Sequence, residues 1–284
     1  MHKIREIDVA EIAERVRDLF LLANTELGED LCCSLRSACE NESNARASCV
    51  LRRLEENLAV ARERAVPICQ DTGMAIAFVD IGADVHITGG TLQSAFDAGV
   101  RAAYLEGGMR CSIVRDPLYH RENTGDNTPA LLHIRQVSGD RIRIIAAPKG
   151  FGSENMSALK MFTPAATDED ILNFVCETVK QAGANPCPPI VVGIGLGSDF
   201  EGVATLAKRA LLRETGSHHA DPLYADLEKR ILRAVNSLGI GPQGFGGDTT
   251  ALSVHIETAP THIAGLPCGV NICCHVCRHR EIII

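Results

Sequence analysis

The fold is decided by one stretch of the sequence, Ile190-Val191-Val192-Gly193-Ile194-Gly195-Leu196-Gly197, together with residues 200–212 that follow it. An apolar run of this length predicts a buried strand, the glycines predict a tight turn, and the amphipathic segment after them predicts a helix. Repetition of strand and helix along a chain is typical of α/β proteins. The glycines do not match a dinucleotide fingerprint, so the turn is expected to bind a small anion such as a carboxylate, or no ligand at all.

Helices and strands alternate through the rest of the chain. The spacing of apolar residues predicts helices at residues 7–23, 51–61, 91–106, 167–183 and 223–238. Strands are predicted at residues 75–79, 251–256 and 269–272, and a hairpin is predicted to join residues 131–135 to residues 141–147. The fold class is therefore α/β, with mixed sheets and a helical N-terminal region. We expect one domain over residues 1–284, made of a mainly helical portion at 1–65 and an α/β portion at 66–284.

The composition is that of a soluble globular protein, with 284 residues, of which 45% are hydrophobic, and a net charge of −8. No apolar run reaches the roughly 20 residues that a membrane span needs, so no membrane association is expected. The negative charge and the absence of a basic block argue against nucleic-acid binding. The N-terminus lacks the apolar core of a secretory signal, so the cytoplasm is the expected location.

The cysteines indicate metal chemistry. Twelve cysteines are many for a cytosolic chain, in which disulfides are rare. Four of them fall in the helical N-terminal region and are expected to be small buried side chains: Cys32, Cys33, Cys39 and Cys49. Three others lie in unlike turns far apart in the sequence: Cys69, Cys187 and Cys274. Three thiolates can hold a [4Fe–4S] cluster by three corners and leave the fourth iron open to a substrate.

Charged residues near these turns are candidates for proton transfer and for carboxylate binding. Asp71 lies two residues from Cys69, where it could act as a general acid or base, or merely bond its own turn. Arg110 and Arg121 could bind carboxylates in a bidentate way, although a lone arginine is more often a solvated surface charge. The polar and glycine-rich segments at residues 123–128, 149–155 and 241–250 are expected to be loops.

Six motifs follow one another along the chain, at residues 67–73, 122–129, 149–155, 187–189, 241–252 and 270–275. Together they resemble the class I fumarase family, which comprises iron–sulfur fumarate hydratases and L(+)-tartrate dehydratases. The resemblance covers residues 8–280 and is with the separate alpha subunit of the two-subunit members.

This resemblance implies an oxygen-sensitive [4Fe–4S] hydro-lyase that acts on a C4 dicarboxylate. The reaction would convert fumarate to L-malate or, in the alternative, L(+)-tartrate to oxaloacetate. The cluster ligands of the family match Cys69, Cys187 and Cys274. Its substrate contacts match Gln70, Asp71, Arg110 and Gly152, with Asp71 as the proton donor to the leaving hydroxyl.

The resemblance also implies a partner protein. Single-chain members of the family carry a further C-terminal domain, with a catalytic threonine base, that has no counterpart in this sequence. A separate beta subunit is expected to supply it, in an α2β2 assembly or around an alpha–alpha dimer. The apolar residues 281–284 are expected either to pack against that partner or to mark a truncated end.

Alternatives for the cysteines stay open at this point. Cys273 would replace Cys274 as a ligand if the strand before them were shifted by one residue. A structural zinc protein would use Cys273, Cys274, Cys277 and a histidine in a closed tetrahedral site. A thiol-based redox sensor would instead need an exposed cysteine with a low pKa beside a second cysteine.

Overall fold

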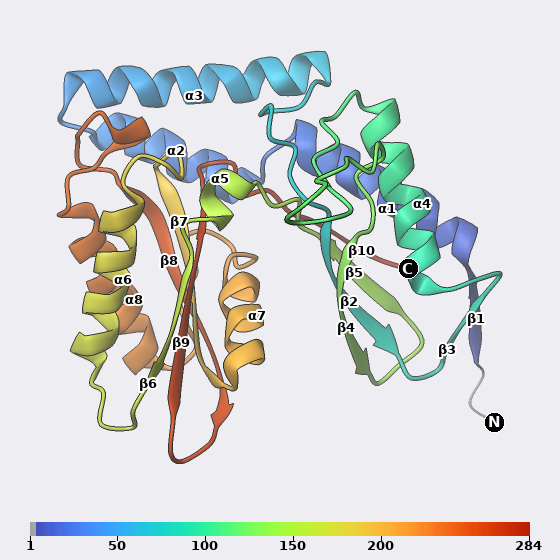
Figure 1. The fold of residues 1–284 in the computed structure, drawn as a ribbon. Coiled ribbons are helices and arrows are strands. Elements are labelled where there is room, and N and C mark those ends of the chain that lie inside the picture. The colour runs from blue at the N-terminus through green and yellow to red at the C-terminus, as the bar shows by residue number, and fades with distance from the viewer. Residues whose placement is uncertain (1–3) are drawn as a thin grey trace. The chain divides into compact units, whose positions relative to one another are not determined.

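The computed structural model describes residues 4–284 (Figure 1). Residues 1–3 lie outside the described residues. They begin the N-terminal segment that, in the sequence analysis, lacks the apolar core of a secretory signal. The chain forms two compact units, each assembled from separate segments. The first unit contains residues up to 28, 58–151 and 278–284, and the second contains residues 29–57 and 152–277. The α/β fold class is confirmed, and the single domain over residues 1–284 stays a prediction.

The first unit is built on a four-stranded mixed sheet with the order β10-β5-β2-β4. These strands are β2 (Ile76–Gly82), β4 (Leu131–Val137), β5 (Ile142–Ala146) and β10 (Arg280–Ile283). A second, parallel pair joins β1 (Arg5–Asp8) to β3 (Val85–Thr88). Two helices, α1 (Val9–Thr25) and α4 (Leu92–Glu106), share a hydrophobic core with the larger sheet.

Helix α4 begins where the sequence predicts it. Thr91 accepts a hydrogen bond from the backbone N–H of Ser94, and the Ser94 hydroxyl accepts one in return from the Thr91 N–H. This capping box satisfies two of the N–H groups that a helix start leaves unpaired. Gly99 then lets α1 approach, because a Cβ atom at that position would lie 2.5 Å from the carbonyl oxygen of Ala13.

The predicted hairpin between β4 and β5 is wrong. Strand β2 lies between them, parallel to β4 and antiparallel to β5. The end of β2 enters the short connection between the two flanking strands, where the Gly82 N–H donates to the Arg141 carbonyl at 2.8 Å. A Cβ at Gly82 would lie 2.3 Å from the Gly139 carbonyl oxygen, so a residue without a side chain is needed there. Local turn signals cannot show that a third strand separates two neighbours.

The apolar C-terminal residues are held inside the first unit. Strand β10 pairs antiparallel with β5, and Ile284 exchanges backbone hydrogen bonds with Ile142. Ile284 is buried and Ile282 packs against the core of this unit, whereas Ile283 is exposed. The expectation that residues 281–284 pack against a partner is therefore corrected, because two of the isoleucines complete this unit's own sheet and core.

The second unit is built on a four-stranded mixed sheet with the order β6-β9-β7-β8. Its strands are β6 (Ala158–Phe162), β7 (Ile190–Ser198), β8 (Ala251–Thr261) and β9 (Leu266–Cys273). Helices α6 (Asp168–Ala182) and α8 (Pro222–Asn236) cover one face of this sheet, and α7 (Phe200–Ala210) covers the other (Figure 1). A short helix, α5 (Phe151–Glu154), precedes β6, and a single 3-10 turn, η1 (Pro242–Gly244), precedes β8.

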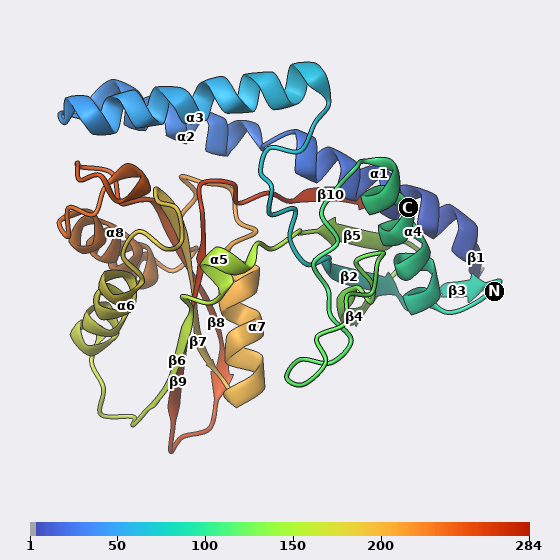
Figure 2. The same cartoon turned by 45° about the horizontal axis from the view of Figure 1, so that its top comes forward.

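Helices α2 (Glu29–Asn41) and α3 (Ala45–Arg64) make up the rest of the helical N-terminal region. They lie side by side (Figure 2), and the Cys39 thiol donates to the Ser48 carbonyl across them at 3.8 Å. The four cysteines on these helices were expected to be buried, and none is. Cys33 is exposed because Leu31 and Leu35 take the buried face of α2, and Cys49 is exposed on α3.

The glycines of the deciding stretch lie in a strand and not in a turn, which corrects the sequence-based expectation. Gly193 and Gly195 face α7, where a Cβ would lie 2.2 Å from the Ala207 carbonyl oxygen and 2.3 Å from that of Val203. The backbone of α7 therefore rests directly on β7. At the start of α7 the Asp199 carboxylate accepts a hydrogen bond from Gly202 N–H at 2.8 Å. A small carboxylate ligand was one expectation for this segment from the sequence. In the structure, the Asp199 side chain is the carboxylate that binds at the start of α7.

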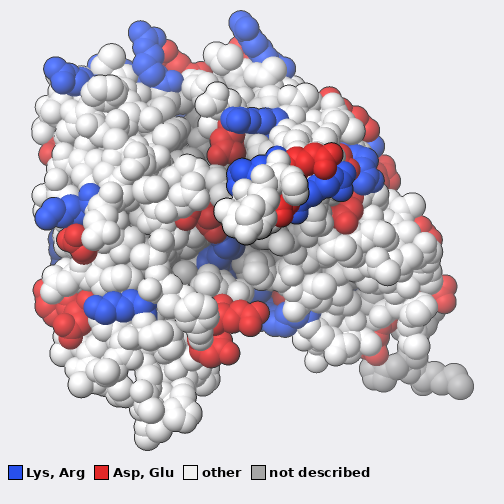
Figure 3. All heavy atoms as spheres, in the orientation of Figure 1, with Lys and Arg blue, Asp and Glu red and all other residues white. Residues whose placement is uncertain are grey.

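Acidic and basic side chains are interspersed on the face of the molecule drawn in Figure 3. Several of them form exposed ion pairs, for example Arg53 with Glu56 and Arg230 with Asp168. Exposed pairs of this kind contribute little to stability, typically ~0–1 kcal/mol each. Among the described residues, no helix combines the length and apolar character needed to cross a membrane.

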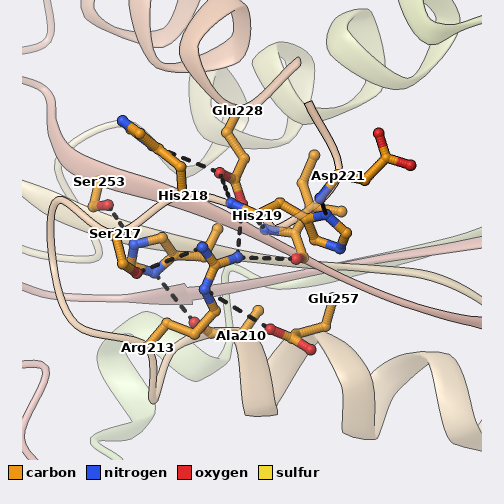
Figure 4. Close-up of polar contacts among 11 residues, drawn as sticks. Ala210, Arg213, Ser217, His218, His219, Asp221, Glu228, Ser253 and Glu257 are labelled. Atoms are coloured by element: carbon orange, nitrogen blue, oxygen red, sulfur yellow. Dashed lines mark hydrogen bonds and ion pairs between the residues drawn. The ribbon is translucent and has the colours of Figure 1, made fainter. Parts of the chain in front are cut away.

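A buried polar network lies in the second unit between α8, β8 and the segment after α7 (Figure 4). Glu228, which is 2% exposed, accepts hydrogen bonds from Arg213 Nη1 and Ile256 N–H, both at 2.8 Å, and from His219 N–H at 2.9 Å. These donors compensate the cost of removing the carboxylate from water. The network ties α8 to β8 and to the chain that leaves α7.

His255 belongs to the same region and is fully buried. Its Nδ1 lies 3.2 Å from the Ala210 carbonyl and its Nε2 lies 2.7 Å from the Ser253 hydroxyl. A carbonyl can only accept, so Nδ1 carries the proton and Nε2 accepts from Ser253. Burial, with the charge of Arg213 in support, lowers the pKa of His255 to about 4. The ring is therefore neutral in the folded protein at neutral pH.

We predict that His255 makes the second unit sensitive to acid. The unfolded chain takes up a proton near pH 6.5 and the folded chain only near pH 4, so this stabilisation is present above pH 6.5 and is lost as the pH falls to 4. The free energy of unfolding should fall by up to ~1.4 kcal/mol per pH unit in that window. Urea titrations of the wild type and His255→Gln would show this slope in the wild type alone. The exposed His262→Gln should behave as the wild type, and equal slopes in all three proteins would contradict the prediction.

Candidate functional site

The turn at residues 69–73 is held in the first unit by side chains from distant parts of the chain. Tyr104 on α4 directs its hydroxyl at the carbonyl oxygens of Thr72 and Gly73, at 2.8 and 2.9 Å. Asn127 Nδ2 donates to the Gly73 carbonyl at 3.1 Å. Tyr104 and Asn127 are fully buried, and burial raises the pKa of Tyr104 far above its ordinary value, so the hydroxyl stays a donor.

Further contacts place Asp71 and Arg110 in one neighbourhood. The Thr72 hydroxyl donates to the Arg110 carbonyl at 3.0 Å. The buried guanidinium of Arg278 donates from Nη2 to the Asp71 carbonyl at 2.5 Å. Arg110 itself is exposed, so its guanidinium is accessible to a ligand. The structure thus brings together two of the residues that the sequence singled out.

The Asp71 carboxylate is oriented by two backbone amides. Oδ1 accepts from Gly73 N–H at 3.1 Å and Oδ2 accepts from Phe151 N–H at 2.9 Å. A Cβ at Gly150 would lie 3.0 Å from Oδ2, so a larger residue there would crowd the Asp71 carboxylate. The motif at residues 67–73 and the start of the motif at residues 149–155 therefore meet at Asp71.

Arg121 lies elsewhere in its loop. Its Nη1 donates to the Pro117 carbonyl at 2.6 Å, and its backbone has a φ of 47°. In the same loop Asp116 accepts hydrogen bonds from the N–H groups of Leu118 and His120, at 3.1 and 2.9 Å. Arg121 thus serves its own loop, while Arg110 stays a candidate for carboxylate binding.

The second unit brings the other two candidate cluster ligands close together. Cys187 is exposed, has a φ of 55°, and lies in the connection between α6 and β7. Cys274 is partly exposed and follows directly after the last residue of β9. His275 Nδ1 lies 3.1 Å from the Cys187 carbonyl, to which it donates because a carbonyl can only accept. This hydrogen bond joins the two cysteine loops.

The neighbouring cysteines have different surroundings. Cys273 is buried within β9, where it pairs with Val191 of β7. Cys277 is buried and its thiol donates to the Leu211 carbonyl at 3.5 Å. Exposure therefore favours Cys274 over Cys273 as a cluster ligand.

The structure gives no separate support for the alternative zinc site. Among residues 4–284, no three or more histidine, cysteine, aspartate or glutamate side chains are grouped so that they could hold a metal ion. Within the second unit, Cys273 lies in β9 and pairs with β7, and the Cys277 thiol donates to the Leu211 carbonyl.

The redox-sensor alternative receives no support from the thiol pKa values that are shifted. Burial raises the pKa of Cys268 to about 12 and also raises those of Cys32, Cys111 and Cys176. A sensor cysteine needs the opposite shift, toward the thiolate.

The three cysteines named from the sequence are of the residue type that holds a [4Fe–4S] cluster. Cys69 belongs to the first unit, and Cys187 and Cys274 belong to the second. Each of the three lies in a loop and has solvent-accessible surface, unlike the buried Cys268, Cys273 and Cys277. Thiolates on loops are the usual ligands of such clusters. The ligand set, and with it the cluster, stays a prediction.

Sequence reasoning missed the residues that hold the site in place. Asn127 fell within the motif at residues 122–129 but was treated only as part of a loop. In the sequence, Tyr104 looked like an ordinary buried residue of a helix. Nothing in the sequence marked Arg278 as a residue that contacts the turn. Their roles depend on contacts over more than thirty residues of chain, from Tyr104 to Thr72 and from Arg278 to Asp71.

Comparison with known proteins matches the stretch of chain that contains the six motifs. Residues 13–283 match the model of the family described as "Fumarate hydratase (Fumerase)". The chain is 45% identical over 269 residues to the "Putative L(+)-tartrate dehydratase subunit alpha" of Methanocaldococcus jannaschii, covering 93% of this chain and 94% of that protein. It is 30% identical over 276 residues to the "L(+)-tartrate dehydratase subunit alpha" of Escherichia coli strain UTI89, covering 96% of this chain and 91% of that protein.

We predict that the Tyr104 hydroxyl stabilises the turn at residues 69–73. Tyr104→Phe leaves two buried carbonyl groups with fewer donors, which should lower the free energy of unfolding by ~1–3 kcal/mol. Chemical denaturation of the purified chain measures this loss. Tyr119→Phe is the matched control, because Tyr119 is 83% exposed and should tolerate the change. An equal effect of the two substitutions would contradict the assigned role.

Proposed function

Because this chain belongs to the fumarate hydratase family, we propose that it is the cluster-binding alpha subunit of a [4Fe–4S]-dependent hydro-lyase. Family and relatives support a hydro-lyase of the fumarate hydratase or tartrate dehydratase type. The proposed reaction is the reversible hydration of a C4 dicarboxylate, fumarate to L-malate. The observation that carries the proposal is the oriented Asp71 carboxylate, two residues from a cysteine and beside the backbone of an exposed arginine.

In this proposal the chain's own residues bind the substrate and handle the proton. A [4Fe–4S] cluster on Cys69, Cys187 and Cys274 would supply a Lewis acid at its open iron. Arg110 would bind a substrate carboxylate in a bidentate way, since its guanidinium is accessible. Asp71 would hold the proton that leaves with, or arrives from, the hydroxyl.

Gln70 and Gly152 complete the substrate contacts proposed for this chain. Gln70 is exposed next to Asp71, so its amide can reach a ligand. Gly152 follows the Phe151 amide that binds Asp71, and the nearest atom to a Cβ placed at Gly152 would be 3.8 Å away. Because its backbone is open, a substrate can approach it closely.

The partner is proposed to be a beta subunit in an α2β2 assembly. The support is that both relatives described above are named as alpha subunits and are matched over more than nine-tenths of their length. The proposed reaction also needs a base for the carbon-bound proton, and Asp71 is already assigned to the hydroxyl. A group on the beta subunit would take that role.

Tartrate is a second candidate substrate. Both relatives carry the name of L(+)-tartrate dehydratase, while the family carries the name of fumarate hydratase. Tartrate bears one hydroxyl more than malate. A site discriminates strongly for such a group only when it places hydrogen-bond partners for it.

We predict that the chain, purified without oxygen, contains close to four irons and four acid-labile sulfides. Cys69→Ser, Cys187→Ser and Cys274→Ser should each lose most of this content, because each removes one corner ligand. Cys49→Ser is the control, since Cys49 is exposed on α3 and is not a proposed ligand. Iron and sulfide analysis of the five proteins is the measurement. Zinc in place of iron, or iron that survives all three substitutions, would refute the cluster.

A second prediction concerns the substrate and the partner. The alpha subunit alone should show no more than traces of activity, and adding the beta subunit should restore hydration of fumarate or dehydration of L(+)-tartrate. Asp71→Asn keeps the shape of the side chain but removes the carboxylate, so turnover should fall by about 10²–10⁴-fold. Rates for the two substrates decide between them. Full activity of the alpha subunit by itself would show that the beta subunit is not needed.

A further inference from the structure

A closed set of polar contacts in the second unit, which we call the α5–β9 network, joins Glu154, Ser157, Lys208 and Asn271. Lys208 Nζ contacts Glu154 Oε1 at 2.5 Å and Asn271 Oδ1 at 3.3 Å. Asn271 Nδ2 donates to Glu154 Oε2 and to Ser157 Oγ, both at 2.8 Å. Each of the four residues therefore contacts at least one of the others across different elements of the fold.

The network is partly shielded from water. Asn271 is 5% exposed, and the side chains of Lys208 and Glu154 are 16% and 24% exposed. Charges removed from water in this way are costly unless they are paired and hydrogen-bonded. A merely structural contact between α7 and the sheet could be made by apolar residues at less cost, as Ala207 and Gly193 do at the neighbouring position of α7. This cost suggests that the network has a role besides packing.

The position of the network indicates that role. Glu154 ends α5, two residues after Gly152. Asn271 precedes Cys274 by three residues, and the Ile272 N–H between them donates to Ser157 Oγ at 3.1 Å. Lys208 projects from α7, which rests on β7 through its glycines. The network thus connects the turn of a proposed substrate contact with the strand end of a proposed cluster ligand, and braces both against α7.

We propose that Lys208 and Glu154 are positioning residues that fix the Gly152 turn relative to the Cys274 end of β9. The inference rests on the proposed function, because Gly152 and Cys274 matter together only in a cluster-dependent hydro-lyase. Neither residue touches the substrate in this inference. Lys208 and Glu154 act through Asn271 and Ser157, which hold the backbone that carries the site.

The network also indicates which substitutions should be tolerated. Its four residues line a cavity of about 220 Å³, together with Ala204, Ala207 and Gly269 among others. The larger guanidinium of Lys208→Arg therefore has room and keeps the charge opposite Glu154. Lys208→Met removes the positive charge beside Glu154, whose carboxylate keeps the hydrogen bond from Asn271. The double variant Lys208→Met/Glu154→Gln removes both charges of this ion pair and serves if the single variant fails to fold.

The test compares these variants in the anaerobically loaded complex of the alpha and beta subunits. Two quantities are measured: the rate at which an iron chelator removes iron, and the split between KM and kcat for the substrate. Lys208→Met and the double variant should each release iron about fivefold or more faster, and should raise KM about tenfold, equivalent to ~1.4 kcal/mol. Their kcat should change much less. Lys208→Arg should restore both values toward those of the wild type.

The control is Arg230→Met, which breaks the ion pair of Arg230 with Asp168 and Glu169 in the same unit, away from both loops. It should leave iron release and KM unchanged. The inference is overturned if the Lys208 variants match this control, or if they change iron release and KM only in step with a loss of folded protein in thermal unfolding. A wild type that holds no iron would instead refute the proposed function, and the inference with it.

Discussion

The direct packing of α7 on β7 is the constraint on which the second unit depends. Gly193 and Gly195 leave no side chain between the helix and the strand, so the carbonyl oxygens of α7 lie within van der Waals distance of the β7 backbone. Any larger residue would push α7 away from the sheet. Because β7 lies in the interior of the sheet and pairs with both β8 and β9, the same contact fixes the strand that ends before Cys274.

In the first unit, the irregular turn at residues 69–73 is held by side-chain contacts and not by regular secondary structure. Carbonyl groups in a buried turn must find donors, because leaving them unpaired costs free energy. Tyr104, Asn127 and Arg278 supply those donors to residues 71–73. These contacts hold the backbone of the turn that carries Asp71, and the carboxylate of Asp71 accepts hydrogen bonds from two backbone amides.

Much of the site was readable in the sequence because its motifs are short and local. Asp71 and Arg110 were named from the sequence, and the structure places them in one neighbourhood. Cys187 and Cys274 were named as well, and His275 joins their loops. The residues that support the site could not be found in this way, because Tyr104 and Lys208 look like ordinary helix residues until their partners are known.

The sequence by itself determined most of the element types, the α/β class and the family, since these follow from periodicity, capping residues and short motifs. Only the tertiary structure decided that β2 separates β4 from β5, that the glycines of β7 face a helix, and that β10 joins the sheet of the first unit. The physical reason is that periodicity records which face of a segment is apolar. Which distant segment covers that face depends on strand pairing and close packing across the whole chain.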